Sequence, residues 1–221
     1  ANILRIIEIS FRDNCMYICS EKSGYVIKNE TIYDLCQLMQ KTKVSEKDSL
    51  LICKDILKGV EYMHDKQLQH RDIKPSNILV FKENSRLTCK IADFGLSRKQ
   101  GHPLSREVVT IWYRAPEVLL QMPYGSPIDC WSVGAVFAEL NLGFPIFGIQ
   151  NPTDIQQLLK IVDVLGHYPG DYLDSLNLSF SIKYTESNLK FENTLLMQIA
   201  MQFLKYNDNE RLTCKEALTY L

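Results

Sequence analysis

The stretch HRDIKPSN, residues 70–77, is followed at once by the apolar residues Ile78, Leu79 and Val80. Its eight positions hold a histidine, an arginine, an aspartate, a lysine and an asparagine, all of which ionise or form hydrogen bonds. Pro75 lacks a backbone N–H and disfavours a helix. The pattern predicts a rigid polar loop ahead of a buried strand.

A second apolar segment, LTCKIA at residues 87–92, ends in Asp-Phe-Gly at residues 93–95. We expect strands at residues 78–81 and 87–91 that pair as a hairpin-like floor bordered by two loops. Such a floor brings four polar side chains within reach of one another: Asp72, Lys74, Asn77 and Asp93.

These four side chains suit phosphoryl transfer, in which catalysis consists mostly of positioning and charge neutralisation. Asn77 and Asp93 offer the oxygen ligands that Mg²⁺ prefers. Asp72 could accept a proton from an attacking hydroxyl, and Lys74 supplies a positive charge for the transferred phosphate. One Asp-Phe-Gly alone is weak evidence, but the ordered set at this spacing is specific.

Composition excludes several other classes of protein. The chain has 221 residues, 46% hydrophobic and 23% charged, with a net charge of −1, which favours neither nucleic-acid binding nor membrane-surface binding. No apolar run approaches a membrane span and no signal peptide opens the sequence, so we expect an intracellular protein, cytoplasmic or nuclear. The seven cysteines are odd in number and include no CxxC pair, which favours reduced, buried or half-buried thiols over a metal site.

The remaining sequence predicts two strands followed by a mostly helical body. Strands are expected at residues 2–9 and 15–21, joined by a turn at 12–14, and a polar connector follows at residues 22–31. Ser45 and Ser126 are predicted as helix N-caps. Five segments have helical patterns: residues 45–65, 126–140, 153–166, 194–206 and 213–221.

Together these motifs resemble those of a eukaryotic protein kinase of the CMGC group, in its cyclin-dependent and MAP-kinase branch. HRDIKPSN resembles the catalytic loop, DFG the metal-binding loop, and VVTIWYRAPEVLL at residues 108–120 the end of the activation segment. DCWSVG at 129–134 resembles the central helix of the large lobe, and residues 146–166 resemble the insert of this branch. The resemblance runs in order from residue 2 to residue 221.

The resemblance implies a role for each matched residue. Asp72 corresponds to the catalytic base and Lys74 to the phosphate-contacting lysine of serine/threonine kinases, while Asn77 and Asp93 correspond to Mg²⁺ ligands. Thr110 corresponds to a threonine that bonds the base and the lysine, and Arg114 to an arginine linked to proline after the target residue.

The nucleotide pocket is matched as well. Glu21 and Ser23 correspond to the hinge that binds adenine, Leu79 to the floor of the purine pocket, and Ser20 to the gatekeeper.

Regulatory and structural roles follow in the same way. Ser105 stands where the branch carries a phosphorylated threonine, and Arg71 and Arg98 match arginines that bind this phosphate. We expect a buried ion pair between Glu117 and Arg211. His70 is expected to pack on Phe94, and Asp129 to accept hydrogen bonds from the catalytic loop. For His64, His102 and His167 the sequence names no partner.

The resemblance implies an α+β protein-kinase-like fold with a mainly α-helical large lobe and only the last strands of the small lobe. We assign residues 1–20 to this remnant, 21–31 to the hinge and connector, and 32–221 to the large lobe. Neither a Gly-rich loop nor the lysine-bearing strand is present in the 221 residues.

Two functions remain open. The first is an ATP- and Mg²⁺-dependent kinase for serine or threonine in proteins, directed to sites followed by proline, with a cyclin-like activator. The second is a non-catalytic kinase-like fragment or binding module.

Overall fold

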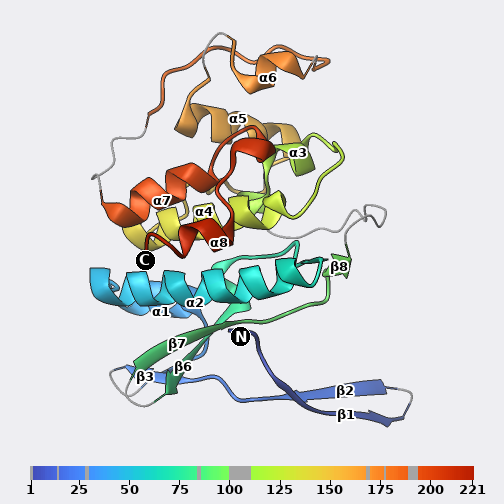
Figure 1. The fold of residues 1–221 in the computed structure, drawn as a ribbon, viewed down its shortest axis with the longest axis vertical. Helices are drawn as coiled ribbons and strands as arrows, with labels where there is room; N and C mark the ends of the chain where they lie inside the picture. Colours follow the sequence, from blue (N-terminus) through green and yellow to red (C-terminus); the bar gives the residue numbers. More distant parts are fainter. Residues whose placement is uncertain are drawn as a thin grey trace.

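The computed structural model describes residues 2–13, 15–27, 30–83, 86–99, 111–167, 170–176, 178–188 and 194–221. Strands gather at one end of the molecule and helices at the other (Figure 1). The expected floor is an antiparallel hairpin of β6 (Ile78–Glu83) and β7 (Arg86–Ile91), in which Leu79 lies opposite Lys90. Both predicted strands are therefore confirmed.

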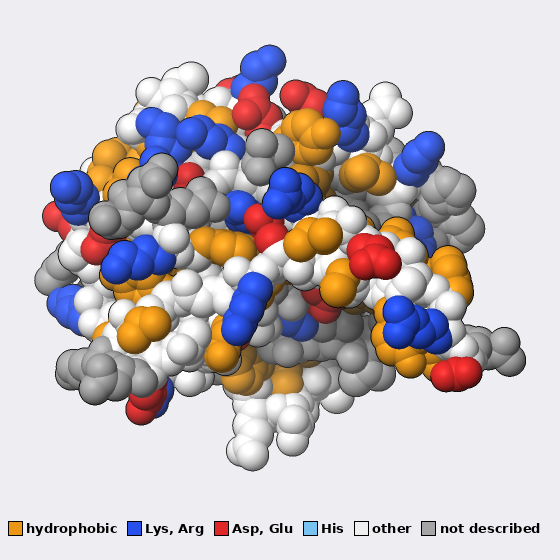
Figure 2. Space-filling view, turned by 90° about the horizontal axis from the view of Figure 1, so that it is seen from below, with side chains coloured by type: hydrophobic (Ala, Val, Ile, Leu, Met, Phe, Trp, Pro, Cys, Tyr) orange, Lys and Arg blue, Asp and Glu red, His pale blue; other side chains and the backbone are white. Residues whose placement is uncertain are grey.

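The first residues of the chain join this floor before they enter a second hairpin. Ile3 bridges in parallel to Ile91, and the amide of Leu4 donates to the carbonyl of Ile91. β1 (Ile6–Arg12) and β2 (Cys15–Ser20) then pair antiparallel. The alternation of strand side chains puts four large apolar residues on one exposed face of this hairpin: Ile9, Phe11, Met16 and Ile18. Ile7 is also exposed and lies where the register between the two strands shifts. Figure 2 views this end of the molecule and shows hydrophobic side chains interspersed with Lys and Arg.

The predicted connector at residues 22–31 is wrong in part, because it contains strands. β3 (Tyr25–Ile27) pairs antiparallel with β4 (Glu30–Ile32). Tyr25 and Ile27 are half-buried and pack against the hydrophobic core, so β3 is attached to the rest of the protein through these two side chains.

The helical body is built around α4 (Pro127–Leu142), which is buried on nearly all sides, as its apolar sequence predicts. Gly134 allows α7 (Leu195–Phe203) to approach closely, since a Cβ there would lie 2.7 Å from the Cβ of Phe203. Pro127 opens α4 and Ser126 occupies its N-cap position, both as expected, but Ser126 has helical backbone angles and its side chain makes no capping hydrogen bond.

The longest helix, α2 (Glu46–Asp65), packs between β7 and α8 (Cys214–Ala217). Ser45 caps it as predicted, because its hydroxyl accepts from the amide of Asp48. The remaining helices are α1 (Leu35–Lys41), α3 (Pro116–Leu119), α5 (Asp154–Leu165) and α6 (Tyr172–Ser175). Short elements are β5 (Leu68–Gln69), β8 (Arg98–Lys99) and the 3-10 turns η1 (Pro75–Asn77), η2 (Ile111–Tyr113) and η3 (Asp208–Glu210).

All seven cysteines are unpaired, but Cys15 and Cys19 are exposed, contrary to the expectation of buried or half-buried thiols. Their strands belong to the β1–β2 hairpin, which the described part of the chain does not cover. Among the described residues, no helix is both long and apolar enough to cross a membrane, and no group of three potential ligands is placed to hold a metal ion.

Candidate active site

One buried carboxylate, that of Asp129, binds the backbone at the start of the HRDIKPSN loop. Asp129, in the first turn of α4, accepts the backbone amide of His70 at 2.9 Å and that of Arg71 at 2.8 Å. Arg71 has φ of 73°, a left-handed conformation that is uncommon outside glycine and costs about 1–3 kcal/mol. The two hydrogen bonds offset this cost. They also confirm the prediction that Asp129 accepts hydrogen bonds from the backbone of this loop.

His64, for which the sequence named no partner, contacts the same carboxylate. Its Nε2 lies 3.0 Å from Asp129 Oδ2. Burial lowers the pKa of His64, but the hydrogen bond and the negative charge of Asp129 raise it more, so the net pKa lies above its ordinary value. Burial raises the pKa of Asp129, but the contact with His64, the nearby His70 and the hydrogen bond from the Arg71 amide together lower it more, so the net pKa lies below its ordinary value. The folded state therefore favours a charged pair.

This pair should make stability depend on pH. A raised histidine pKa contributes stability that is complete below about pH 6.5, the unfolded value, and is lost as pH rises through the folded pKa. Hydrogen bonds to charged groups contribute about 1.5–3 kcal/mol. Urea denaturation measures the free energy of unfolding at pH 6 and pH 8.5. Between these two pH values, wild type should lose part of these ~1.5–3 kcal/mol and His64→Gln should lose less. Equal losses in the two proteins would contradict a charged His64–Asp129 pair.

Within the loop, Asp72, Lys74 and Asn77 form one contact cluster. Asp72 Oδ2 lies 2.9 Å from Lys74 Nζ and accepts a hydrogen bond from Asn77 Nδ2 at 2.8 Å. Asn77 Nδ2 also donates to the backbone carbonyl of Asp72 at 2.8 Å. Since both contacts use the amide nitrogen, the amide oxygen of Asn77 takes no part in them and could serve as a ligand.

Asp93 reaches this cluster through the backbone of the second strand. The amide of Ala92 donates to the carbonyl of Asn77 at 2.9 Å, which places Asp93 directly after a residue bound to the loop. Asp93 is exposed, has φ of 61°, and accepts the amide of Gly95. The two loops thus lie together, as expected, although the Asp93 carboxylate makes no described contact with the side chains of Asp72, Lys74 or Asn77.

His70 ties the two loops together. It is buried, its Nε2 lies 2.9 Å from the carbonyl of Ala92, and its ring meets the edge of Phe94 at 5.1 Å between centroids. The predicted packing of His70 on Phe94 is confirmed.

The donor set of the site suits a magnesium ion. The Asp93 carboxylate and the Asn77 amide oxygen, on adjoining loops, match the hard oxygen ligands of Mg²⁺.

The predicted hinge lies beside the β6–β7 hairpin. The amide of Glu21 donates to the carbonyl of Arg5, and the amide of Gly24, which follows Ser23, donates to the carbonyl of Val80 at 2.9 Å. Ser20 is exposed at the end of β2, where its hydroxyl donates to the Glu21 carbonyl. Leu79 is half-buried on β6, one residue before Val80.

The predicted regulatory residues lie on separate elements. Arg71 is half-buried in the loop, and Arg98 is exposed on β8, which pairs with β5 just before that loop. Arg114 lies 3.9 Å from Asp154 at the start of α5. Ser105, Thr110 and His102 fall outside the described residues.

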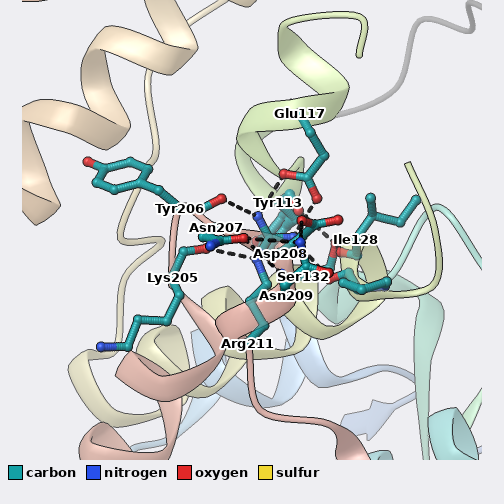
Figure 3. A network of polar contacts seen from close by, with 11 residues as sticks. Tyr113, Glu117, Ile128, Ser132, Lys205, Tyr206, Asn207, Asp208, Asn209 and Arg211 are labelled. Carbon is teal, nitrogen blue, oxygen red and sulfur yellow. Dashed lines mark hydrogen bonds and ion pairs between the residues drawn. The ribbon is translucent and has the colours of Figure 1, made fainter. Parts of the chain in front are cut away.

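A polar network joins η2, α3 and the start of α4 to the segment between α7 and α8 (Figure 3). Arg211 binds the Glu117 carboxylate through two nitrogens, with one contact of 2.7 Å, and both residues are buried. The predicted buried ion pair is confirmed. Tyr113, nearby, donates to Glu139 at 2.7 Å.

Known proteins resemble this chain in sequence and in fold. The family model "Protein kinase domain" matches residues 1–220. The chain belongs to the protein kinase family. Within it, this kinase is 36% identical to two curated proteins of Trypanosoma brucei brucei. They are cell division control protein 2 homolog 1, matched over 76% of the kinase chain and 62% of the relative, and homolog 3, matched over 92% and 69%.

A solved structure is also similar. The crystal structure of the yeast RNA Pol II CTD kinase CTDK-1 complex contains a chain that matches with a TM-score of 0.77 and 28% identity, over 98% of this kinase and 74% of that chain. The α+β protein-kinase fold is therefore confirmed, and the kinase is a cyclin-dependent-kinase-like member of the CMGC group.

Sequence reasoning missed two kinds of supporting residue in the kinase. His64 lies in the last turn of α2 and contacts Asp129, which is 65 positions away in the sequence, and no local sequence signal pointed to this contact. His167, buried, contacts Asp174 at 3.1 Å, close to a pocket of about 410 Å³ lined in part by Phe180 and Tyr184. None of Asp72, Lys74 and Asn77 lines that pocket.

Proposed function

We propose that this kinase transfers the terminal phosphoryl group of ATP to serine or threonine residues of proteins. The observation that carries the proposal is the Asp72–Lys74–Asn77 cluster, joined through the Asn77–Ala92 backbone bond to Asp93. Two carboxylates, an amide and a lysine on two adjoining loops are the groups that phosphoryl transfer requires.

Each residue has a distinct part in the proposed reaction. Asp72 accepts the proton of the attacking hydroxyl, and Lys74, beside it, offers its positive charge to the phosphate. Asn77 and Asp93 hold Mg²⁺, which supplies charge neutralisation for the nucleotide phosphates. The backbone of Glu21 and Ser23 receives adenine, and Leu79 closes the purine pocket from below.

The finer features of the proposal rest on the resemblance to cyclin-dependent kinases. Arg114 would favour proline after the target residue, and phosphate on Ser105 would bind Arg71 and Arg98. Thr110 would bond Asp72 and Lys74. A cyclin-like activator is proposed as partner. Residues 1–20 are proposed as strands of the small lobe, residues 21–31 as the hinge and connector, and residues 32–221 as the large lobe.

Asp93→Asn tests the metal role in the full chain. Removing the carboxylate charge should raise the Mg²⁺ concentration needed for half-maximal phosphoryl transfer by at least tenfold, because a neutral amide is a poorer ligand for a hard cation.

The acceptor residue is tested in wild type. Transfer from MgATP to a mixture of proteins, followed by phosphoamino-acid analysis, should give phosphoserine or phosphothreonine. Phosphotyrosine alone, or an unchanged Mg²⁺ requirement in the variant, would contradict the proposal.

A further inference from the structure

The hinge segment is fixed at both ends by the large-lobe hairpin. At its far end, the amide of Gly24 donates to Val80 on β6, and Gly24 bridges to Phe81. At its near end, a side chain rather than the backbone makes the link. Glu21 reaches Lys90 on β7 at 3.0 Å.

The Glu21 carboxylate connects three segments that are distant in the sequence. Its Oε1 accepts the backbone amide of Arg5 at 2.9 Å, and its Oε2 accepts Lys90 Nζ. The Glu21 amide returns a hydrogen bond to the carbonyl of Arg5. The hinge is thereby held against both the residues before β1 and the strand that leads to Asp93.

Lys90 is well placed for this contact. It lies opposite Leu79 in the β6–β7 register, so both side chains project from the same face of the hairpin. Its Nζ is also 4.6 Å from the centre of the Phe81 ring, a distance at which a cation is attracted to an aromatic face.

The pair is more than a surface salt bridge. Only 18% of the Glu21 side chain and 15% of the Lys90 side chain are exposed. Burial raises the pKa of Glu21, but the Arg5 amide and Lys90 together hold it below its ordinary value, so the carboxylate is charged at neutral pH. Removing one partner would leave the other charge largely desolvated.

We infer that Glu21 and Lys90 form a hinge clasp, a pair of positioning residues that preorganises the hinge backbone for the adenine of ATP. This inference rests on the proposed function. A hinge already held in its binding geometry loses less conformational entropy when nucleotide binds, so the clasp should act on nucleotide affinity and not on the chemical step.

Lys90→Met in the full chain is the main test, with Lys90→Arg as the conservative variant and Lys82→Met, an exposed lysine on β6, as the matched control. We expect the Kd and KM for MgATP to rise about tenfold in Lys90→Met, equivalent to about 1.4 kcal/mol, with kcat unchanged. Hydrogen exchange at the Arg5 amide should quicken. Lys90→Arg should restore most of the affinity, and Lys82→Met should match wild type.

A double-mutant cycle with Glu21→Gln tests whether the two residues act together. Because Glu21→Gln removes the charge that Lys90 meets, adding Lys90→Met should weaken MgATP binding little further. Additive losses, an unchanged Kd in Lys90→Met, or an equal loss in Lys82→Met would overturn the clasp.

Calorimetry of MgATP binding, together with an assay of phosphoryl transfer, distinguishes a failure of the hinge clasp from a failure of the proposed function. If wild type binds MgATP and Lys90→Met binds it equally well, the clasp is wrong while the proposed function stands. If wild type binds nucleotide with the expected variant effects but transfers no phosphate, the clasp stands and the proposed function is wrong. If wild type binds no nucleotide, both are overturned.

Discussion

Replacing Arg211 with methionine should lower the free energy of unfolding by about 3–5 kcal/mol, because it leaves the buried Glu117 carboxylate without its counter-ion. The guanidinium also donates to the carbonyls of Lys205 at 2.8 Å and of Tyr206 and Pro127, each at 3.2 Å. All of these acceptors lose their donor together.

Packing adds to this effect. The guanidinium carbon of Arg211 lies 5.1 Å from the centre of the Trp131 ring, on the central helix α4. Methionine would keep part of the apolar volume but neither the charge nor the planar set of donors. The loss should therefore be felt in the core of the large lobe and not only at its surface.

Urea denaturation of wild type and variants measures this prediction. The pair Glu117→Gln with Arg211→Met should cost less than the sum of the two single changes, because no buried charge is then stranded. Lys205→Met, an exposed neighbour, should change stability by no more than about 0.5 kcal/mol. A loss below about 1 kcal/mol in Arg211→Met would contradict the buried-pair argument.

Asp72→Asn should lower kcat for phosphoryl transfer by about 10²–10⁴-fold if Asp72 is the proposed base. An amide cannot take the proton of the substrate hydroxyl at neutral pH. The substitution keeps the size of the side chain and one oxygen that can still accept from Asn77 or Lys74. Folding should therefore change much less than turnover.

The test compares kcat and the thermal midpoint of the full-length wild type and variant. Glu186→Gln changes an exposed carboxylate outside the HRDIKPSN loop, so it serves as the control and should leave both values unchanged. Retained turnover in Asp72→Asn would remove Asp72 from the mechanism. A collapse of the thermal midpoint would show that the Asp72 contacts with Lys74 and Asn77 are mainly structural.

Much of the fold could be predicted because the patterns that encode it are local. Ile52, Ile56 and Met63 recur at helical spacing and all lie on the buried side of α2. The helical segment predicted at residues 153–166 is α5, with Thr153 and Gly166 as its two caps. The connector was misjudged because its strands are only three residues long, and their pairing and burial against β6 depend on the rest of the chain.

The sequence by itself determined the family, the main helices and the β6 and β7 strands, and the residues that make up the HRDIKPSN and DFG motifs, because motif spacing and periodicity are properties of neighbouring positions. Only the tertiary structure decided which side chains support that loop and the hinge. His64 meets Asp129 across 65 positions, and Glu21 meets Lys90 across 69. Such contacts depend on where whole elements pack, and a single charged residue at a helix end or on a strand carries no local sign of its distant partner.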